Sequence, residues 1–315
     1  MHNKCLFCYQ PLGEGDKDFH SKCSKKIFGT KEAPELDFSW DQMHELAKEV
    51  IQSHVTVPGV QAKLSFHFTP QRGQKNRLTL VGVWGNYILK PPTQQFEQLP
   101  ENEDLTMHLA NLFRMNVVPH SLIRLKSGEL AYITKRIDRI GEKKLAMEDL
   151  CQLSERLTED KYKGSMEQVG EMIKHYSSNP LFDAQVFFEL ALFSFLTGNA
   201  DMHLKNFSMI DDENGLTRLA PAYDLLSTRL IIPEKDDPEE LALTMNGRKR
   251  KFRMGDFQQL AKSLNLNQKQ TDNIFKRFLK FMPSVLDFIN SSFLSEDKKL
   301  KYKELIQERA DRLFT

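Results

Sequence analysis

The sequence has few cysteines, no excess of charge of either sign and no long hydrophobic run. Only 4 of its 315 residues are cysteine: Cys5, Cys8 and Cys23 lie near the N-terminus, and Cys151 stands alone. This distribution excludes a disulfide-stapled scaffold. The 44 basic and 43 acidic side chains nearly cancel, so net charge gives no signal for a nucleic-acid or acidic partner.

No apolar run approaches the roughly 20 residues that span a bilayer. The N-terminal segment MHNKCLFCYQ also lacks the apolar stretch of a secretory signal. These two absences point away from a membrane and make the cytoplasm the expected location.

The hydrophobic pattern predicts a β-rich part followed by a helical part, which suits a chain too long for one small core. Ser39 and Gln42 fit a capping box, so a helix is expected to begin near Ser39. Residues 55–92 alternate apolar and polar positions between turn-rich segments and predict an antiparallel sheet. A helix over about 102–115 follows, and two more strands meet at Ser127 and Gly128.

After Gly141 the pattern is mainly helical. The segment FFELALFSFLTG is apolar almost throughout, which predicts a central helix that is buried on most sides and ends at Gly198. Residues 257–315 have the spacing of amphipathic helices. The fold class expected from these patterns is α+β.

Three polar residues after the apolar helix have the order and spacing of a phosphotransfer site. Asp201 precedes Asn206 by five positions in GNADMHLKNFS, and Asp224 follows in APAYDLLS. Phosphoryl transfer needs a carboxylate that orients the acceptor hydroxyl and side-chain oxygens that hold metal ions. Asp201 is expected to orient the acceptor hydroxyl, and Asn206 and Asp224 are expected to hold the metal ions. An isolated Asp-x4-Asn is as often a capped helix end, but Asp224 favours catalysis.

The β-rich part offers a cation and a loop that suit bound phosphates. Lys90 ends the apolar run YILK, where it is either the phosphate-binding lysine or a solvated strand end. Glu103 opens the next helix and either pairs with Lys90 or interacts with the helix dipole. Gly59, in HVTVPGVQAKLSF, could present backbone N–H groups to phosphates, although an ordinary turn has the same composition.

Four residues of metal-binding type lie in two close pairs at the N-terminus. Cys5 and Cys8 form one pair, and His20 and Cys23 form the other. Their spacing is typical of a structural Zn²⁺ site, and the alternative is ordinary residues of a reduced cytosolic protein. His2 could replace one of the ligands.

Over residues 55–294 the sequence resembles the HipA family of bacterial serine/threonine kinases, the toxin halves of toxin–antitoxin pairs. The motifs that carry the resemblance occur in the same order: TVPGVQAK, YILKPP, ENED, KRIDR, MEDLCQL, GNADMHLKNFS and APAYDLLS. Several motifs in one order are far more specific than any single one. The resemblance implies an α+β, two-lobed, protein-kinase-like fold with a mainly helical larger lobe.

The resemblance also implies an ATP and Mg²⁺ site. Its catalytic residue is Asp201, and its Mg²⁺ ligands are Asn206 and Asp224. The residues implied to contact ATP are Gly59, Val60, Gln61, Lys63, Lys90, Glu103, Met147, Glu148, Asp149, His203 and Lys205. The expected organisation is a zinc knuckle over 1–30, a lobe with the phosphate loop over 31–140, and a helical lobe with the catalytic and metal loops over 141–315.

Members of the family phosphorylate a serine in their own glycine-containing loop. The matching residue here is Thr56, which departs from the family pattern, and Ser53 and Ser65 are nearby alternatives. The chain also lacks the N-terminal β subdomain of full-size members, as the shorter HipT-like members do, so a separate small protein is expected to supply it. The implied partners are a DNA-binding antitoxin of HipB-like type and a translation-related substrate such as an aminoacyl-tRNA synthetase.

The function expected is an ATP-dependent protein serine/threonine kinase of HipA-like toxin type, controlled by its antitoxin. One alternative is a small-molecule kinase of aminoglycoside-phosphotransferase type, which would label metabolites and not protein. The other is an inactive scaffold or co-repressor, which would not require Asp201, Asn206, Asp224 and Lys90 together. The basic run 248–253 could contact nucleic acid, although a solvated surface has the same composition.

Overall fold

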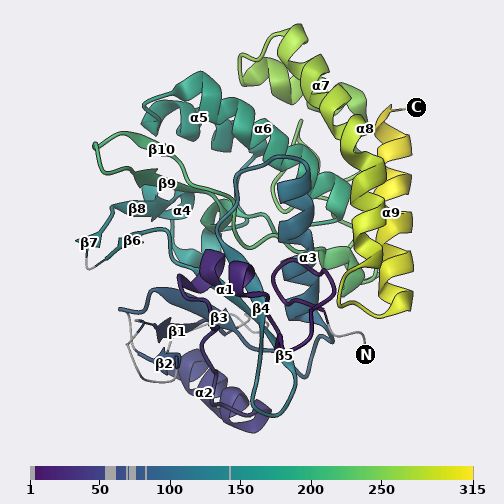
Figure 1. Cartoon of the computed structure of the whole chain (residues 1–315). Coiled ribbons are helices and arrows are strands. Elements are labelled where there is room, and N and C mark those ends of the chain that lie inside the picture. Colours follow the sequence, from purple (N-terminus) through teal and green to yellow (C-terminus); the bar gives the residue numbers. More distant parts are fainter. Residues whose placement is uncertain are drawn as a thin grey trace. The chain divides into compact units, whose positions relative to one another are not determined.

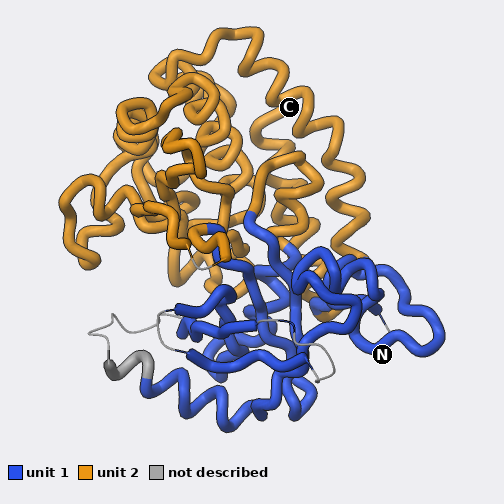
Figure 2. Tube along the Cα trace, turned by 60° about the vertical axis from the view of Figure 1, so that its left-hand side comes forward, with its two compact units in different colours: residues 1–105, 118–137, 291–294 blue, residues 106–117, 138–290, 295–315 orange. Residues whose placement is uncertain are grey.

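The computed structural model describes residues 4–53, 62–68, 70, 76–81, 84–141 and 143–314, without the side chains of residues 50–53. Two compact units divide the chain, as Figure 2 shows. Unit 1 contains residues 1–105, 118–137 and 291–294, and unit 2 contains residues 106–117, 138–290 and 295–315.

Unit 1 is built on a five-stranded antiparallel sheet with the strand order β2-β1-β3-β5-β4 (Figure 1). Its strands are β1 (Leu64–His67), β2 (Thr79–Leu80), β3 (Tyr87–Lys90), β4 (His120–Arg124) and β5 (Leu130–Lys135). Apolar side chains such as Phe66, Leu89 and Ile133 are fully buried on it. The antiparallel sheet predicted from the alternating segments is therefore confirmed.

The helices of unit 1 follow local sequence signals. Helix α1 (Ser21–Phe28) precedes α2 (Trp40–Ser53). At the start of α2, the Ser39 N–H donates to Gln42 Oε1 at 2.9 Å and the Gln42 N–H donates to Ser39 Oγ at 3.4 Å, which confirms the capping box.

Helix α3 (Leu99–Leu112) starts in unit 1, and its second half belongs to unit 2. The boundaries predicted for it, about 102–115, were wrong by three residues at each end. Pro100 fits the first turn of a helix because its missing N–H needs no partner there. Arg114 has a φ of 62°, a left-handed conformation that cannot continue the helix.

Unit 2 is mainly helical and has two small antiparallel sheets. One pairs β6 (Arg139–Ile140) with β7 (Lys143–Lys144), and the other has the order β10-β9-β8. The strands of the latter are β8 (Met147–Asp149), β9 (Ser208–Asp211) and β10 (Thr217–Leu219). The α-helices are α4 (Leu150–Leu153), α5 (Met166–Tyr176), α6 (Pro180–Thr197), α7 (Met254–Ser263), α8 (Gln268–Asn290) and α9 (Glu296–Phe314).

Helix α6 is the core of unit 2. It contacts α5, α7, α9 and β10, and all of its residues from Phe187 to Thr197 are buried. Length and hydropathy alone would let this helix cross a membrane, but 72% of it is buried inside the structure, as expected for a core helix. The central buried helix predicted from FFELALFSFLTG is confirmed.

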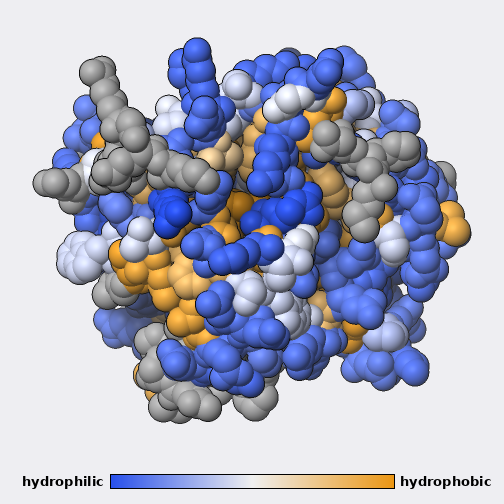
Figure 3. All heavy atoms as spheres, turned by 60° about the horizontal axis from the view of Figure 1, so that its bottom comes forward, coloured by the Kyte–Doolittle hydropathy of each residue, from blue (hydrophilic) through white to orange (hydrophobic). Residues whose placement is uncertain are grey.

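The face of the molecule in Figure 3 is mostly hydrophilic, with smaller hydrophobic patches.

Candidate functional site

The loop that carries Asp201 starts where α6 must end. Gly198 caps α6 with a φ of 70°, and its N–H donates to Phe195 O at 3.2 Å. A Cβ atom at Gly198 would lie 2.7 Å from Leu305 Cδ2 and 3.0 Å from Arg229 Cβ. Only glycine satisfies both the left-handed conformation and the close packing. The end of the helix therefore determines where the loop begins.

Asp201 and Asn206 are joined directly inside this loop. Asn206 Nδ2 donates to the Asp201 backbone carbonyl at 2.8 Å. Since that carbonyl is an acceptor, the Asn206 amide must present its nitrogen to it, which leaves Oδ1 as an oxygen ligand for a hard cation. At the other end, the Asp201 N–H donates to Asn199 Oδ1 at 3.1 Å. These two hydrogen bonds, one to the N–H and one to the carbonyl of Asp201, fix the backbone of the residue that carries the carboxylate.

Asp224 is attached to the same loop through its neighbour. The Tyr223 hydroxyl lies 2.6 Å from Ser208 Oγ and donates to the Lys205 carbonyl at 3.0 Å. Asp224 itself has a φ of 56°, which is uncommon for a residue other than glycine. Carboxylate and amide oxygens suit Mg²⁺, so Asp224 and Asn206 could hold it.

His203 lies close enough to Asp201 and Asp224 for their charges to affect its pKa. Burial lowers the pKa of His203 to about 4, although the Asp201 and Asp224 carboxylates both act to raise it. Its Nδ1 atom is buried and has no hydrogen-bond partner among the described residues. At neutral pH the imidazole is therefore uncharged and adds no positive charge beside these carboxylates.

The segment implied to contact adenine and ribose lies beside the loop that carries Asp201 and Asn206. Strand β8 contains Met147, Glu148 and Asp149 and pairs with β9, which follows the loop directly. Lys205 Nζ forms an ion pair with Asp149 Oδ2 at 3.0 Å. Unit 2 thus contains β8 and Lys205 beside the loop with Asp201, His203 and Asn206. Asp224 is attached to the same loop through Tyr223.

Lys90 and Glu103 form a buried ion pair in unit 1. Lys90 Nζ lies 2.6 Å from Glu103 Oε1, and the two side chains are 4% and 1% exposed. The ammonium group also lies 5.5 Å from the centre of the Tyr132 ring. Of the two interpretations of Glu103, the structure selects the partner of Lys90. The solvated interpretation of Lys90 was wrong, because β3 directs its side chain into the core.

The loop predicted to cover the phosphates lies mostly outside the described residues. Thr56, Gly59, Val60 and Gln61 lie outside the described residues, as does the side chain of Ser53. Lys63 is exposed just before β1. Ser65 Oγ accepts a hydrogen bond from the Gly85 N–H at 3.1 Å.

Half of the basic run 248–253 is engaged within unit 2. Arg248 forms an ion pair with Asp256, Lys249 lies 3.0 Å from Glu239, and Phe252 is buried. These contacts favour a structural role for this part of the run.

Tyr162 is a site residue that sequence reasoning missed. Its hydroxyl donates to Asp201 Oδ1 at 2.6 Å, and its ring lies edge-on to His203 with centroids 5.0 Å apart. Burial and the Asp201 charge raise the pKa of Tyr162 above its usual range, so the hydroxyl remains a donor. Tyr162 belongs to none of the motifs, so only the folded loop reveals it.

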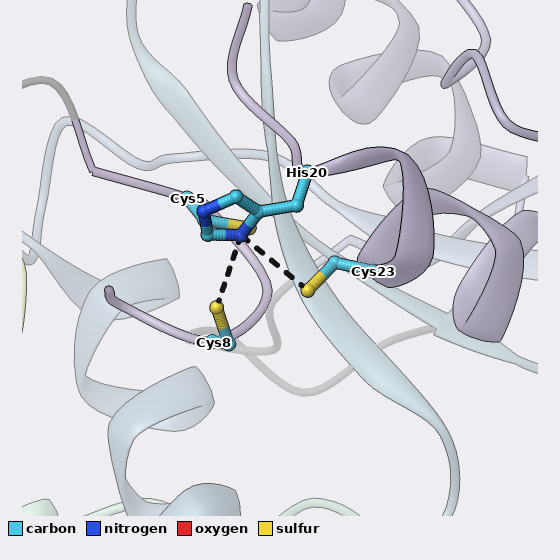
Figure 4. Close-up of side chains that lie close together, drawn as sticks. All are labelled: Cys5, Cys8, His20 and Cys23. Atoms are coloured by element: carbon cyan, nitrogen blue, oxygen red, sulfur yellow. Dashed lines mark hydrogen bonds between the residues drawn. The ribbon is translucent and has the colours of Figure 1, made fainter. Parts of the chain in front are cut away.

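The four N-terminal Cys and His side chains converge in unit 1, as Figure 4 shows. One ligand atom from each of Cys5, Cys8, His20 and Cys23 lies within 4.8 Å of the others. Burial and the neighbouring Cys5 raise the pKa of Cys23 to about 12. The cysteines are free thiols, and His2 lies outside the described residues.

Comparison with known proteins finds three relatives that are similar to this chain in sequence. The protein named "Putative kinase Y4dM" of Sinorhizobium fredii is 35% identical over 193 residues, which cover 58% of this chain and 47% of that protein. A "Putative kinase" of Haemophilus influenzae is 28% identical over 299 residues, 84% of each chain. The "Serine/threonine-protein kinase toxin HipA" of Shewanella oneidensis is 28% identical over 212 residues, 61% of this chain and 47% of the toxin. The chain therefore spans about half the length of two of these relatives.

Solved structures agree on the fold. A chain of the Shewanella oneidensis complex of HipA, HipB and operator DNA matches with a TM-score of 0.67 at 24% identity, covering 82% of this chain and 65% of that one. The Helicobacter pylori proinflammatory kinase CtkA matches with a TM-score of 0.53 at 17% identity, covering 72% and 87%. The fold is thus α+β and kinase-like.

A model of the HipA-like C-terminal domain matches residues 55–286. This match covers the buried ion pair of Lys90, the loop with Asp201 and Asn206, and Asp224, and it extends over more than half of the sequence. The chain therefore belongs to the family of proteins with a HipA-like C-terminal domain.

Proposed function

We propose that the chain is an ATP- and Mg²⁺-dependent protein serine/threonine kinase of HipA-like toxin type. The observation that carries the proposal is the hydrogen bond from Asn206 Nδ2 to the Asp201 carbonyl, which holds a carboxylate and an oxygen ligand in one loop. Family membership and the kinases among the relatives support the same activity.

The proposed roles follow from the chemistry of each side chain. Asp201 accepts a hydrogen bond, and then the proton, from the acceptor hydroxyl. Asn206 Oδ1 and the Asp224 carboxylate hold Mg²⁺, which neutralises phosphate charge when it is bound. Lys90, oriented by Glu103, binds the phosphates, and β8 with the Asp149–Lys205 pair binds the nucleoside.

The proposal extends to the phosphate loop and the domains. Gly59, Val60, Gln61 and Lys63 cover the phosphates, and Thr56 is the candidate for autophosphorylation. Residues 1–30 form a zinc knuckle, 31–140 the N-terminal kinase lobe and 141–315 the C-terminal lobe. The substrate is a translation-related protein in the cytoplasm, such as an aminoacyl-tRNA synthetase.

A partner of HipB-like type is proposed because the Shewanella oneidensis relative was solved in a complex with HipB and operator DNA. Contact with DNA would then be indirect, through this antitoxin. A separate small protein that resembles the family's N-terminal subdomain is proposed as a second partner.

The decisive experiment incubates the full chain with γ-labelled ATP and Mg²⁺ and locates the label by mass spectrometry. Asp201→Ala is expected to lower phosphoryl transfer by about 10²–10⁴-fold, the usual loss for a general base. Its affinity for nucleotide should be largely retained. Asp236→Ala is the matched control, because Asp236 is an exposed acidic residue of the same unit.

Each outcome has a distinct meaning. Label on the chain that is lost in Asp201→Ala supports the kinase, and equal label in this variant overturns the role of Asp201. Transfer only to small metabolites would indicate the aminoglycoside-phosphotransferase type. Absence of both label and ATP binding would indicate the inactive scaffold.

A further inference from the structure

The Cys/His cluster of unit 1 has the dimensions of a tetrahedral metal site. With Zn–S distances near 2.3 Å and a Zn–N distance near 2.05 Å, tetrahedral geometry requires a sulfur-to-nitrogen separation of about 3.5 Å. His20 Nδ1 lies 3.4 Å from Cys8 Sγ and 3.7 Å from Cys23 Sγ. These two separations bracket the required value.

The orientation of the His20 ring supports the same conclusion independently. His20 Nε2 lies 2.9 Å from the Pro11 carbonyl oxygen. Because a carbonyl only accepts, Nε2 carries the hydrogen, and Nδ1 directs its lone pair at the sulfurs, as Figure 4 shows. Histidine ligands of zinc commonly donate their other N–H to a carbonyl or carboxylate in this way.

Local backbone structure presents the two ligand pairs. The Tyr9 N–H donates to Cys5 O at 2.9 Å, which closes a turn around Cys5 and Cys8. His20 lies immediately before α1, and the Cys23 N–H donates to His20 O at 2.9 Å, which places both on one turn. Two short turns thus bring four ligands together from separate parts of the segment.

We propose that Cys5, Cys8, His20 and Cys23 bind one structural Zn²⁺ ion as thiolates and a neutral imidazole. Binding releases the thiol protons to solvent and involves no redox step. Four protein ligands leave no open coordination position, so the ion has a structural role and no direct part in phosphoryl transfer.

The segment held by these ligands is attached to the edge of the five-stranded sheet. The Leu122 N–H donates to Leu6 O at 3.3 Å, and Ser121 Oγ donates to the same carbonyl at 3.2 Å. Arg124 and Asp18 form an ion pair at 2.9 Å. Strand β4 is the edge strand of this sheet, so the knuckle covers backbone groups that would otherwise be exposed.

The knuckle also contacts the helix that carries Glu103. The Tyr9 hydroxyl donates to Asp104 Oδ2 at 2.6 Å, and Asp104 Oδ1 lies 2.7 Å from His120 Nδ1 on β4. Asp104 follows Glu103, the partner of Lys90, on α3. We infer that the zinc knuckle is a positioning element for the Lys90–Glu103 pair, and this second step rests on the proposed function.

The metal is tested first without reference to activity. The full chain, purified without chelator, should contain one equivalent of zinc by elemental analysis. Cys8→Ser and Cys23→Ser should lose it, whereas Cys151→Ser, the same change at a buried cysteine outside the cluster, should retain it. Absence of zinc together with failure to take up added Zn²⁺, or full zinc content in both cluster variants, would overturn the site.

Two further measurements keep the test valid if the serine variants fail to fold. Co²⁺ bound to the wild-type chain should show tetrahedral visible bands and thiolate charge transfer, and their absence in a cobalt-loaded chain would overturn the ligand set. His20→Cys retains four ligands and should bind Zn²⁺. His20→Ala should weaken binding by more than about 100-fold, because even outer-shell changes cost 10–100-fold.

The positioning step has its own readout. A chelator should lower the Tm, and added Zn²⁺, but not Mg²⁺, should restore it. Tyr9→Phe should retain zinc but weaken ATP binding, whereas unchanged ATP affinity would overturn the positioning role. A protein that contains zinc but transfers no phosphate would refute only the proposed kinase activity. A protein that transfers phosphate but binds no zinc would refute only the proposed zinc site.

Discussion

The Tyr162 hydroxyl donates a 2.6 Å hydrogen bond to Oδ1 of Asp201. An acceptor serine or threonine would have to make the same kind of bond with this carboxylate before it loses its proton. In the proposed reaction, Tyr162 would therefore occupy the position of the acceptor hydroxyl. Its side chain is 43% exposed, so it can be displaced at modest cost.

Tyr162→Phe should raise the rate of phosphoryl transfer. A hydrogen bond to a charged group contributes about 1.5–3 kcal/mol when buried, and solvent exposure reduces this to about 0.5–1 kcal/mol. The expected gain in kcat/KM is about two- to fivefold, measured with labelled ATP and a protein acceptor. A tenfold loss would instead identify Tyr162 as the residue that orients Asp201.

Lys90→Met should destabilise the protein and weaken ATP binding. It leaves the Glu103 carboxylate buried without its ion-pair partner, which typically costs about 3–5 kcal/mol. The double variant Lys90→Met with Glu103→Leu should regain most of the free energy of unfolding but none of the ATP affinity. Denaturant unfolding and nucleotide titration distinguish these effects, and recovered affinity in the double variant would remove Lys90 from the phosphates.

Gly198→Ala should cost more stability than Gly215→Ala, although both glycines have a positive φ. The Cβ at position 198 would lie 2.7 Å from Leu305 Cδ2, whereas nothing lies within 4 Å of the Cβ at position 215. The expected loss is about 1 kcal/mol at Gly215 from backbone strain alone, and about 2–4 kcal/mol at Gly198. Equal losses in urea unfolding would show that packing around the α6 end is not tight.

His203 should make stability depend on pH. Burial lowers the pKa of His203 to about 4, from an ordinary value of 6.5, so the unfolded chain binds the proton more readily. The contribution of His203 to the free energy of unfolding is therefore fully present above pH 6.5 and is lost as pH falls toward 4. Between pH 7.5 and 5 the metal-free protein should lose about 2 kcal/mol through this group.

The comparison that isolates this effect is His203→Gln against His175→Gln, since His175 is exposed on α5. The stability difference between wild type and His203→Gln should shrink as pH falls, and His175→Gln gives the effect of the same change at an exposed histidine. Asp201, Asp224 and Lys161 also act on His203, so their protonation states must be unchanged in the range used. A difference for His203→Gln that stays constant with pH would contradict the lowered pKa of His203.

Features that depend on neighbouring residues in the chain were predictable from the sequence. The Ser39 cap, the antiparallel strands and the buried helix ending at Gly198 follow from local patterns, because periodicity and turn chemistry act over a few residues. The spacing of Asp201 and Asn206 is local in the same sense, and the structure joins them by a hydrogen bond.

Only the tertiary structure could decide which residues from separate segments meet. The sequence left Glu103 between a helix-dipole role and a partner for Lys90, and the folded structure shows the ion pair. Tyr162 meets Asp201 across 39 positions, and no motif contains it. Such contacts depend on how the elements pack around a shared core, which propensity and spacing along the chain do not encode.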